Sequence, residues 1–182
     1  MKVTPTAIPD VLLLAPPFHS DRRGIFLESW RAERYAPVGI DLPFVQDNHS
    51  RSVRHTLRGL HYQVERPQGK LISVITGMVY DVAVDLRRSS PTFGRAVGVT
   101  LTEDTHEQLW IPPGFAHGFY VLSDRADLIY KCTAYYTAEL DRTLAWDDPD
   151  VAILWPLVAP APPLLSAKDA SGLRLGDAPS YP

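Results

Sequence analysis

The chain has 182 residues, of which 45% are hydrophobic and 21% are charged, and its formal net charge is −3. This length fits one domain with a substantial core, and the mildly acidic balance argues against nucleic acid as a partner. The single cysteine, Cys132, excludes an internal disulfide and a multi-cysteine zinc site, and it suits a reducing cytoplasm.

The first forty residues predict only short regular elements. We expect an N-terminal strand arm over residues 1–20 and a helix of about two turns over residues 28–35, which Pro37 and Gly39 would end. The longest early apolar run, residues 11–15, is too short to span a membrane and lacks the flanks of a signal peptide. We therefore expect a cytoplasmic protein with no membrane partner.

A period of two dominates the middle of the chain, as in strands with one buried face. In residues 78–86 the apolar side chains share one parity, while Asp81 and Asp85 take the other. Residues 126–136 alternate in the same way and place Tyr130 and Tyr136 on the apolar, inward face. Short strands broken by glycine and proline predict a mainly β fold of the jelly-roll kind with a few short helices.

Proline accumulates toward the C-terminus, from Pro156 to Pro182 and including Pro160. We expect an irregular tail over residues 156–182 that lies over the core as an extended arm and has a ragged end after about Gly172. No linker divides the sequence, so residues 1–182 are expected to form a single domain.

The segment around His61 suggests a site, with or without a metal. Arg58 and His61 differ in strand parity, so Gly59 between them is a candidate for a β-bulge that turns one of them. A metal-binding double-stranded β-helix has a second histidine two residues after the first, where this chain has Gln63. His117 fits the place of a third histidine, but two imidazoles without a carboxylate make a poor zinc or iron site. We expect no catalytic metal.

Four side chains form a candidate acid–base set, and each also has a structural interpretation. His61 suits proton removal near neutral pH, because an imidazole has a pKa of about 6.5, but a lone histidine can also be a core residue. Tyr130 could donate a proton or pack in the core. Lys70 could stabilise an oxyanion or stay solvated. Asp169 could orient an imidazole or cap a turn.

Other polar groups could contact a ligand. His117 fits a pocket or a structural role equally well. The polar run of residues 46–50 either presents alternate members to a cavity or forms a solvated edge. Arg23 and Glu28 either contact a ligand or form a surface ion pair.

Several stretches, in one register over residues 21–170, resemble a known family. They are DRRGIFLE (21–28), FVQDNHS (44–50), LRGLHYQ (57–63), QGKL (68–71), DVAVDLR (81–87), SPTFG (90–94), GFAHGF (114–119), YKCT (130–133), WP (155–156) and SAKD (166–169). With these motifs the chain resembles the dTDP-4-dehydrorhamnose 3,5-epimerases of nucleotide-sugar metabolism.

This resemblance implies a cupin-type jelly roll that forms a homodimer by exchanging N-terminal strands. It also implies inversion of C3 and C5 of dTDP-4-dehydro-6-deoxy-D-glucose without a metal or nucleotide cofactor. In that reaction His61 would be the base, Asp169 its partner, Tyr130 the acid on the other face of the sugar ring, and Lys70 the cation facing the ketone oxygen. The positions that would contact the nucleotide or sugar are Arg23, Glu28, Gln46, Asp47, Asn48, Arg58, His117, Tyr136, Asp141 and Lys168.

One of these positions departs from the family, because Asp141 stands where a glutamate is usual, and its shorter side chain leaves that contact open. Three other functions also stay open. They are an epimerase that acts at C3 alone or C5 alone, a non-catalytic module that binds a sugar nucleotide, and a metal-dependent cupin oxygenase.

Overall fold

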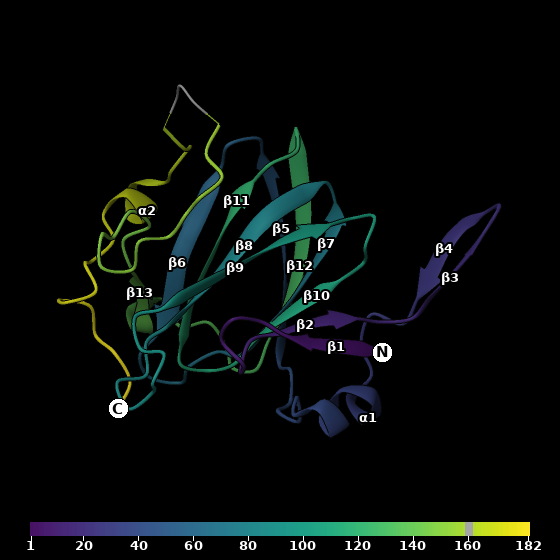
Figure 1. Ribbon diagram of the computed structural model, residues 1–182, viewed down its shortest axis with the longest axis horizontal. Helices are drawn as coiled ribbons and strands as arrows, with labels where there is room; N and C mark the ends of the chain where they lie inside the picture. The colour runs from purple at the N-terminus through teal and green to yellow at the C-terminus, as the bar shows by residue number, and fades with distance from the viewer. Residues whose placement is uncertain (159–161) are drawn as a thin grey trace.

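Two antiparallel β-sheets face each other in the computed structural model, which describes residues 1–158 and 162–182 (Figure 1). The six-stranded sheet has the order β1 (Lys2–Pro5), β2 (Leu12–Ala15), β10 (Gln108–Ile111), β7 (Lys70–Thr76), β12 (Arg125–Cys132) and β5 (Gln46–Val53). The five-stranded sheet has the order β13 (Asp141–Thr143), β6 (Leu57–Gln63), β11 (Phe115–Val121), β8 (Met78–Asp85) and β9 (Ala96–Thr102). The predicted mainly β jelly roll is confirmed.

The main hydrophobic core fills the space between the two sheets. Its buried side chains include Ile72 of β7 and Leu128 of β12 from one sheet, and Val79 of β8 and Phe119 of β11 from the other. Burying one such side chain stabilises a fold by roughly 1.5–3 kcal/mol. The core therefore holds the two sheets in a fixed relation, and side chains that point between them keep defined positions.

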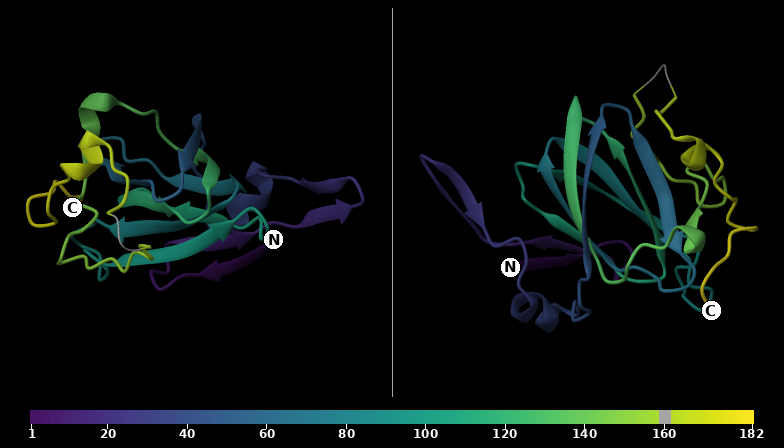
Figure 2. Two further views of the ribbon diagram at one scale, coloured as in Figure 1. Left: turned by 90° about the horizontal axis from the view of Figure 1, so that it is seen from above. Right: turned by 180° about the vertical axis from the view of Figure 1, so that it is seen from behind.

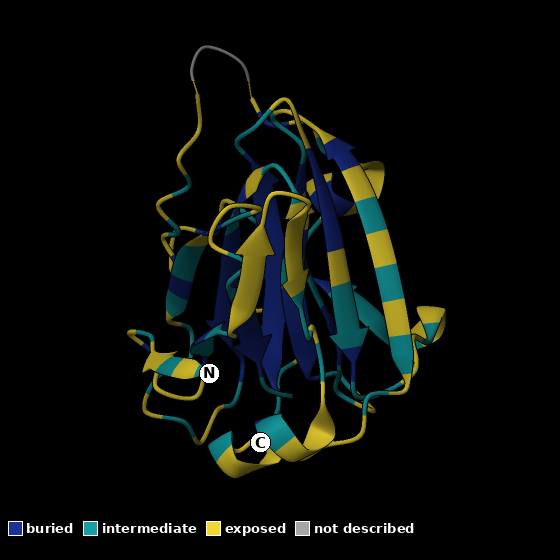
Figure 3. Cartoon of the chain, turned by 90° about the vertical axis from the view of Figure 1, so that its right-hand side faces the viewer, coloured by how far each residue is buried: buried dark blue, intermediate teal, exposed yellow. Residues whose placement is uncertain are grey.

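Strand β5 lies at the edge of the six-stranded sheet and alternates between exposed and inward residues (Figure 3). Its inward face is polar, with Gln46, Asn48, Ser50 and Ser52. Of the two interpretations of residues 46–50, the structure favours the one in which alternate residues face inward. An apolar strand at this edge would have extended the hydrophobic core, but β5 presents polar side chains instead.

The alternation predicted for residues 78–86 describes only half of β8. Val82 and Val84 pack on the outer side of the sheet, where the C-terminal segment covers them, while Val79 and Ala83 lie in the main core on the opposite face. The strand is buried on both faces, so its residues of both parities are apolar. Asp81, on the inward face, is completely buried and needs a partner there.

Strands β3 (Phe18–Asp21) and β4 (Gly24–Leu27) form a hairpin that projects away from the body of the molecule (Figure 2). Its apolar side chains are exposed, and Phe26 is 73% exposed. The helix predicted over residues 28–35 is reduced to α1 (Ala32–Tyr35) and a following 3-10 turn, η1 (Ala36–Val38). The predicted start at residue 28 is wrong, because the backbone of Arg31 is extended, with φ of −155° and ψ of 118°, and the helix begins only at Ala32. Among the described residues, every helix is too short or too polar to cross a membrane.

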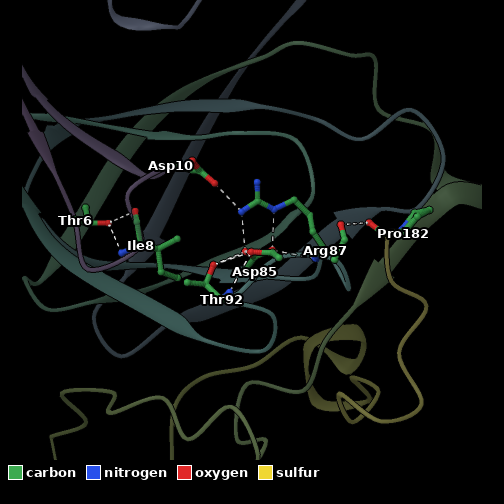
Figure 4. Close-up of polar contacts among 9 residues, drawn as sticks. Thr6, Ile8, Asp10, Asp85, Arg87, Thr92 and Pro182 are labelled. Carbon is green, nitrogen blue, oxygen red and sulfur yellow. Dashed lines mark hydrogen bonds and ion pairs between the residues drawn. The ribbon is translucent and has the colours of Figure 1, made fainter.

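An ion-pair network around the buried Asp85 joins β8 to the first strands (Figure 4). The carboxylate of Asp85 accepts hydrogen bonds from the side chains of Arg87, Ser90 and Thr92, at 2.6–2.9 Å. Arg87 also donates to Asp10, in the loop between β1 and β2, at 2.8 Å. Burial alone would raise the pKa of Asp85, but these hydrogen bonds outweigh it and lower the pKa to about 2. Except for Asp10, the residues that form this network come from the motifs DVAVDLR (81–87) and SPTFG (90–94), which therefore have a structural role here.

The C-terminal segment is irregular and packs along the five-stranded sheet. It contains the short helix α2 (Ala167–Ala170), and another 3-10 turn, η2 (Ala138–Leu140), precedes β13. The expected ragged end after Gly172 is wrong, because the backbone N–H of Tyr181 donates to Leu86 and its hydroxyl donates to the carbonyl of Gln63. Residues 159–161 of the expected tail, Pro160 among them, lie outside the described residues.

Candidate active site

Two adjoining cavities open between the sheets, with volumes of about 310 and 180 Å³. Both are lined by His61, Lys70 and Tyr130. The larger cavity is also lined by Gln46, Asn48, Tyr62, Gln68, Tyr136, Asp141 and Lys168. The smaller cavity is also lined by Ser50, Arg58, His117, Gly118 and Phe119. Most of the residues singled out in the sequence therefore meet at one place.

A β-bulge brings Arg58 and His61 into the same cavity. His117 of β11 pairs with His61, and Phe119 pairs with Arg58, so the single residue Gly118 lies opposite two residues of β6. This extra residue changes the parity of the strand, as the glycine at position 59 suggested. At Gly59, φ is +125° and an added Cβ would lie 2.5 Å from the Cα of Gly118, so a side chain has no room there.

Asp169 holds the imidazole of His61. Nε2 of His61 lies 2.7 Å from Oδ1 of Asp169, and the same carboxylate accepts a hydrogen bond from the backbone N–H of Gly59. Its other oxygen accepts from the hydroxyl of Ser166 in the capping box that begins α2. Asp169 therefore belongs to a helix capping box and contacts the imidazole of His61 with the same carboxylate.

The charges in this pair follow from the contacts. Burial alone would raise the pKa of Asp169, but the hydrogen bonds from His61, Ser166 and Gly59 outweigh it and lower the pKa to about 2. The carboxylate is therefore ionised near neutral pH and accepts from Nε2 of His61. In residues 1–158 and 162–182, no group hydrogen-bonds to Nδ1 of His61, and the side chain is 32% exposed. That nitrogen is available to a ligand.

Tyr130 and Lys70 reach the cavities from the other sheet. Tyr130 lies on β12, and burial is the main cause that raises its pKa, so the phenol stays protonated near neutral pH. Lys70 begins β7 and donates through Nζ to the backbone carbonyl of His61 at 3.3 Å. Burial lowers the pKa of Lys70, and nearby Cys132, Asp141 and Asp81 partly offset this. The amine of Lys70 is therefore buried beside the backbone of His61 and lines the same cavities.

Two further polar side chains in the smaller cavity are held by their neighbours. Nε2 of His117 lies 2.9 Å and 3.1 Å from the two oxygens of Asp81, and both residues are buried. Burial lowers the pKa of His117 despite the opposing effect of Asp81. Arg58 donates to the hydroxyl of Ser52 at 2.9 Å. His117 thus lines the smaller cavity and is also held by the buried Asp81, while Ser52 holds Arg58.

Asp141 reaches its neighbours despite its short side chain. Its Oδ2 accepts a hydrogen bond from the hydroxyl of Tyr136 at 3.0 Å and another from Nζ of Lys168. Tyr136 was predicted to point inward from a strand, but β12 ends at Cys132 and Tyr136 is 52% exposed. Its aromatic ring therefore stands at the mouth of the larger cavity instead of inside the core.

Three predicted contact residues lie elsewhere. Asp47 points to the outer face of β5, as strand parity requires, and pairs with Lys131 at 2.8 Å. Arg23, at the tip of the projecting hairpin, is 84% exposed and pairs with Asp21. Glu28 follows the hairpin and pairs with Arg34 at 2.8 Å. The structure therefore brings none of the three into either cavity of this chain.

The sequence interpretation missed several residues of the site. Asp81 could have been found from its parity, which is opposite to that of its apolar neighbours. Ser166 could have been found as a serine three residues before Asp169, which is the spacing of a capping box. Ser50 belongs to the polar run whose alternate members could face a cavity, but Tyr62 and Gln68 gave no signal that distinguishes them from ordinary strand and loop residues.

Gln63 stands at the place of a second metal-binding histidine and is used by the fold. Its side-chain amide donates to the carbonyls of Arg66 and Tyr135 and accepts from the backbone N–H of Thr137. Across residues 1–158 and 162–182, no three side chains of His, Cys, Asp or Glu gather as a metal site would require. Gln63 instead fixes the loop that carries Tyr136.

Comparison with known proteins identifies a single family. The sequence profile described as dTDP-4-dehydrorhamnose 3,5-epimerase matches residues 5–177. The enzyme of that name from Pseudomonas aeruginosa is 50% identical over 183 residues, with 100% of both chains covered. The one from Neisseria gonorrhoeae is 52% identical over 94% of this chain, which spans only 52% of that longer protein.

A solved structure is also very similar. The dTDP-6-deoxy-D-glucose-3,5-epimerase of Legionella pneumophila, in complex with dTDP-4-keto-L-rhamnose, superposes with a TM-score of 0.94 at 50% identity. The superposition covers 97% of this chain and 93% of that one.

Proposed function

The chain belongs to the dTDP-4-dehydrorhamnose 3,5-epimerase family, and we propose that its two adjoining cavities form the active site. The enzyme is an isomerase that inverts C3 and C5 of dTDP-4-dehydro-6-deoxy-D-glucose to give dTDP-4-dehydro-L-rhamnose. The observation that supports this site best is that its proposed base and its proposed acid come from opposite sheets. His61 comes from one sheet and Tyr130 from the other, and both line the same cavities.

Both inverted carbons lie next to the C4 ketone of the sugar. Removing the proton from C3 or from C5 therefore places negative charge on one shared oxygen. A single cation can stabilise both enolates, and Lys70 is the buried cation that lies beside His61. Removing such a stabiliser from an active site typically raises the barrier by about 2.7–4 kcal/mol. We assign this role to Lys70.

His61 is the proposed base. Asp169 is ionised and accepts from Nε2 of His61, which leaves Nδ1 of this cavity-lining residue with a lone pair that can take a proton. After Nδ1 removes a proton, the imidazole carries a positive charge, and the carboxylate stabilises it. The same carboxylate fixes the ring orientation, so the base meets the substrate in one geometry. A positioned base of this kind accelerates proton transfer about 10²–10⁴-fold.

Tyr130 is the proposed acid. Inversion requires that a proton leaves one face of the carbon and returns to the other face. Tyr130 stands on the sheet opposite to His61, and its raised pKa keeps a proton on the phenol near neutral pH. A sugar ring held between the two sheets would therefore lose a proton toward β6 and gain one from β12.

The nucleotide has a natural place in the larger cavity. Tyr136 at its mouth offers an aromatic ring for the base, and Lys168 is a cation at the same mouth. The smaller cavity then holds the sugar, with Arg58 near the diphosphate, whose oxygens suit the planar guanidinium. Binding energy from the nucleotide is remote from the reacting carbons and positions them.

A second copy of the chain would explain the residues that lie outside the cavities. Arg23 and Glu28 match contact positions of the family but lie on or beside the projecting hairpin. We propose a homodimer in which the β3–β4 hairpin of the single jelly-roll domain, and not the whole predicted arm of residues 1–20, reaches the partner's cavity and buries Phe26. We also propose a cytoplasmic location, which the lone cysteine supports.

The test is incubation with dTDP-4-dehydro-6-deoxy-D-glucose in D₂O, with deuterium read separately at C3 and C5 by NMR. The proposal predicts label at both carbons with inverted configuration. Label at one carbon alone would contradict the proposal and indicate an epimerase that inverts only that carbon. Binding of the nucleotide sugar with no label at either carbon would leave only a binding module.

A further inference from the structure

Ser50 carries a buried hydroxyl that the protein leaves unpaired. It belongs to the polar inward face of β5, together with Gln46, Asn48 and Ser52. The amide of Gln46 donates to Asn48, and the hydroxyl of Ser52 accepts from Arg58. By contrast, Oγ of Ser50 is buried and has no hydrogen-bond partner within the part of the chain that the structure describes.

An unpaired buried hydroxyl is unfavourable, because the group loses its hydrogen bonds to water and gains none in return. Ser50 lines the smaller cavity, beside Arg58 and His117. A molecule that fills this cavity can supply the missing partner. The free protein therefore carries a polar group whose hydrogen bond forms only in a complex.

The position of Ser50 indicates which part of the substrate it meets. Ser50 pairs with Leu128 of β12, and Tyr130 lies two residues further along that strand, on the same inward face. Ser50 is therefore the diagonal neighbour of the proposed acid. The hexose carries a ketone at C4, a methyl group at C5 and free hydroxyls at C2 and C3. The ketone faces Lys70 in the proposed mechanism. The ring oxygen and the oxygen at C1 only accept hydrogen bonds, so the hydroxyls at C2 and C3 are the polar groups of the sugar that can both donate to and accept from a serine.

We propose that Ser50 is a specificity-determining residue that hydrogen-bonds to one of the two free ring hydroxyls, at C2 or C3, of the bound hexose. This inference rests on the proposed function, because it places the sugar in the smaller cavity. A serine hydroxyl both donates and accepts, so it can pair with a sugar hydroxyl in either configuration. Ser50 thus adds recognition of the sugar at a position where the side chain does no chemistry.

The experiment is a double-mutant cycle between enzyme and substrate. Wild type and Ser50→Ala are compared on dTDP-4-dehydro-6-deoxyglucose and on its 2-deoxy and 3-deoxy analogues. Exchange of the C5 proton with D₂O is the readout, because all three compounds retain that proton. We expect kcat/KM of the wild type to fall roughly 3- to 10-fold on the analogue that lacks the partner hydroxyl. We expect Ser50→Ala to lose the same factor on the parent compound and no more on that analogue.

Two outcomes would overturn the inference. One is an equal loss for Ser50→Ala on all three compounds, and the other is no loss on any of them. Failure of the wild type to exchange C5 of the parent compound would instead refute the proposed function. Ser50→Gly removes the same hydroxyl and carries the test if the alanine variant does not fold.

Thr143 provides the matched control. Its Oγ1 is also buried without a hydrogen-bond partner among residues 1–158 and 162–182, but Thr143 does not line either cavity. Thr143→Val and Ser50→Ala both remove an unpaired hydroxyl, so neither is expected to lower the melting temperature of the free enzyme. Only Ser50→Ala should change the ratio of kcat/KM between the parent compound and one analogue. The same change in Thr143→Val would assign the effect to general packing and contradict the inference.

Discussion

His61 and Asp169 are 108 residues apart in the chain, and their side chains meet at 2.7 Å. Strand β6 carries the histidine in the five-stranded sheet, and the C-terminal segment returns along that sheet to deliver the carboxylate on α2. The capping box of α2 fixes the carboxylate before any ligand is present. The proposed base is thus oriented by a residue whose own position is determined by a helix start.

The first prediction concerns Asp169→Asn. The amide has nearly the same shape but removes the negative charge that stabilises the imidazolium of His61. We expect kcat to fall about 10²–10⁴-fold while the affinity for dTDP stays unchanged. Steady-state kinetics and calorimetric titration with dTDP measure the two quantities.

Asp148→Asn is the control for damage to the C-terminal segment. Asp148 is buried and accepts from the backbone N–H groups of Asp150 and Leu175, outside both cavities. The Asp148→Asn variant should be less stable than the wild type and should keep a kcat close to that of the wild type. Equal losses of kcat in the two variants would show that Asp169 acts only through the fold.

The second prediction separates the two proton transfers. Tyr130→Phe keeps the ring and removes the proposed acid, so His61 can still remove a proton and return it to the same face. In D₂O, recovered substrate should gain deuterium while inverted product forms about 10²–10⁴-fold more slowly than in the wild type. NMR of substrate and product in one reaction provides both rates. Wild-type rates of inversion would reject Tyr130 as the acid.

The third prediction is an early alkaline loss of activity. Burial disfavours the charged form of Lys70, so its pKa lies below the 10.5 of an exposed lysine. The proposed mechanism needs the cation, and activity should therefore fall as the pH rises through this lowered pKa. Tyr130 does not cause the loss, because its pKa is raised. Lys70→Arg, whose guanidinium stays charged, should move the alkaline limb of the kcat profile to higher pH even if kcat itself is reduced.

The fourth prediction concerns stability. The pKa of Asp85 is about 2 in the fold, against 3.8 for an unperturbed carboxyl, so its ionised form stabilises the fold by roughly 2 kcal/mol. The sign follows from the lowered pKa, because this contribution is complete above pH 3.8 and is lost as the pH falls through about 2. Asp85→Asn should therefore destabilise the protein at pH 7 and have less effect at low pH in urea unfolding. Asp124→Asn, in an exposed pair with Arg54, should change little at either pH.

The fifth prediction tests the dimer. Phe26→Ser removes the most exposed aromatic ring of the hairpin and should shift sedimentation from dimer toward monomer. If the hairpin carries Arg23 to the partner's cavity, KM for the nucleotide sugar should rise as well. Leu154→Ser is the comparison, because Leu154 is 88% exposed on the C-terminal segment. Dimerisation that is weakened only by Leu154→Ser would place the interface elsewhere.

The fold could be predicted from the sequence where strands have one buried face. Strands β9 and β12 alternate in sequence and place Val97, Leu101, Ala126 and Leu128 in the main core, and the jelly roll follows from several such strands. Strand β8 could not be predicted in full, because the C-terminal segment covers its outer side and the strand therefore carries apolar residues on both faces. That cover depends on contacts between distant segments, such as the hydrogen bond from Tyr181 to Leu86, which no local pattern shows.

The site was predicted mainly from the resemblance to a family. Spacing alone left each of His61, Lys70, Tyr130 and Asp169 with a structural alternative. Parity supports Gln46 and Asn48 as lining residues, and the same parity turns Asp47 outward. The hydrogen bond between Asp81 and His117 and the unpaired hydroxyl of Ser50 depend on three-dimensional contacts, so they could not be inferred from the sequence.

The bulge in β6 makes the backbone conformation of one glycine, and not only the catalytic side chains, a requirement of this pocket. A side chain at position 59 would have no room against Gly118, and straightening the bulge would turn Arg58 away from the cavity that His61 faces, with every catalytic side chain still present. A library of variants should therefore contain many tolerated exchanges on the outer surface, yet none at position 59.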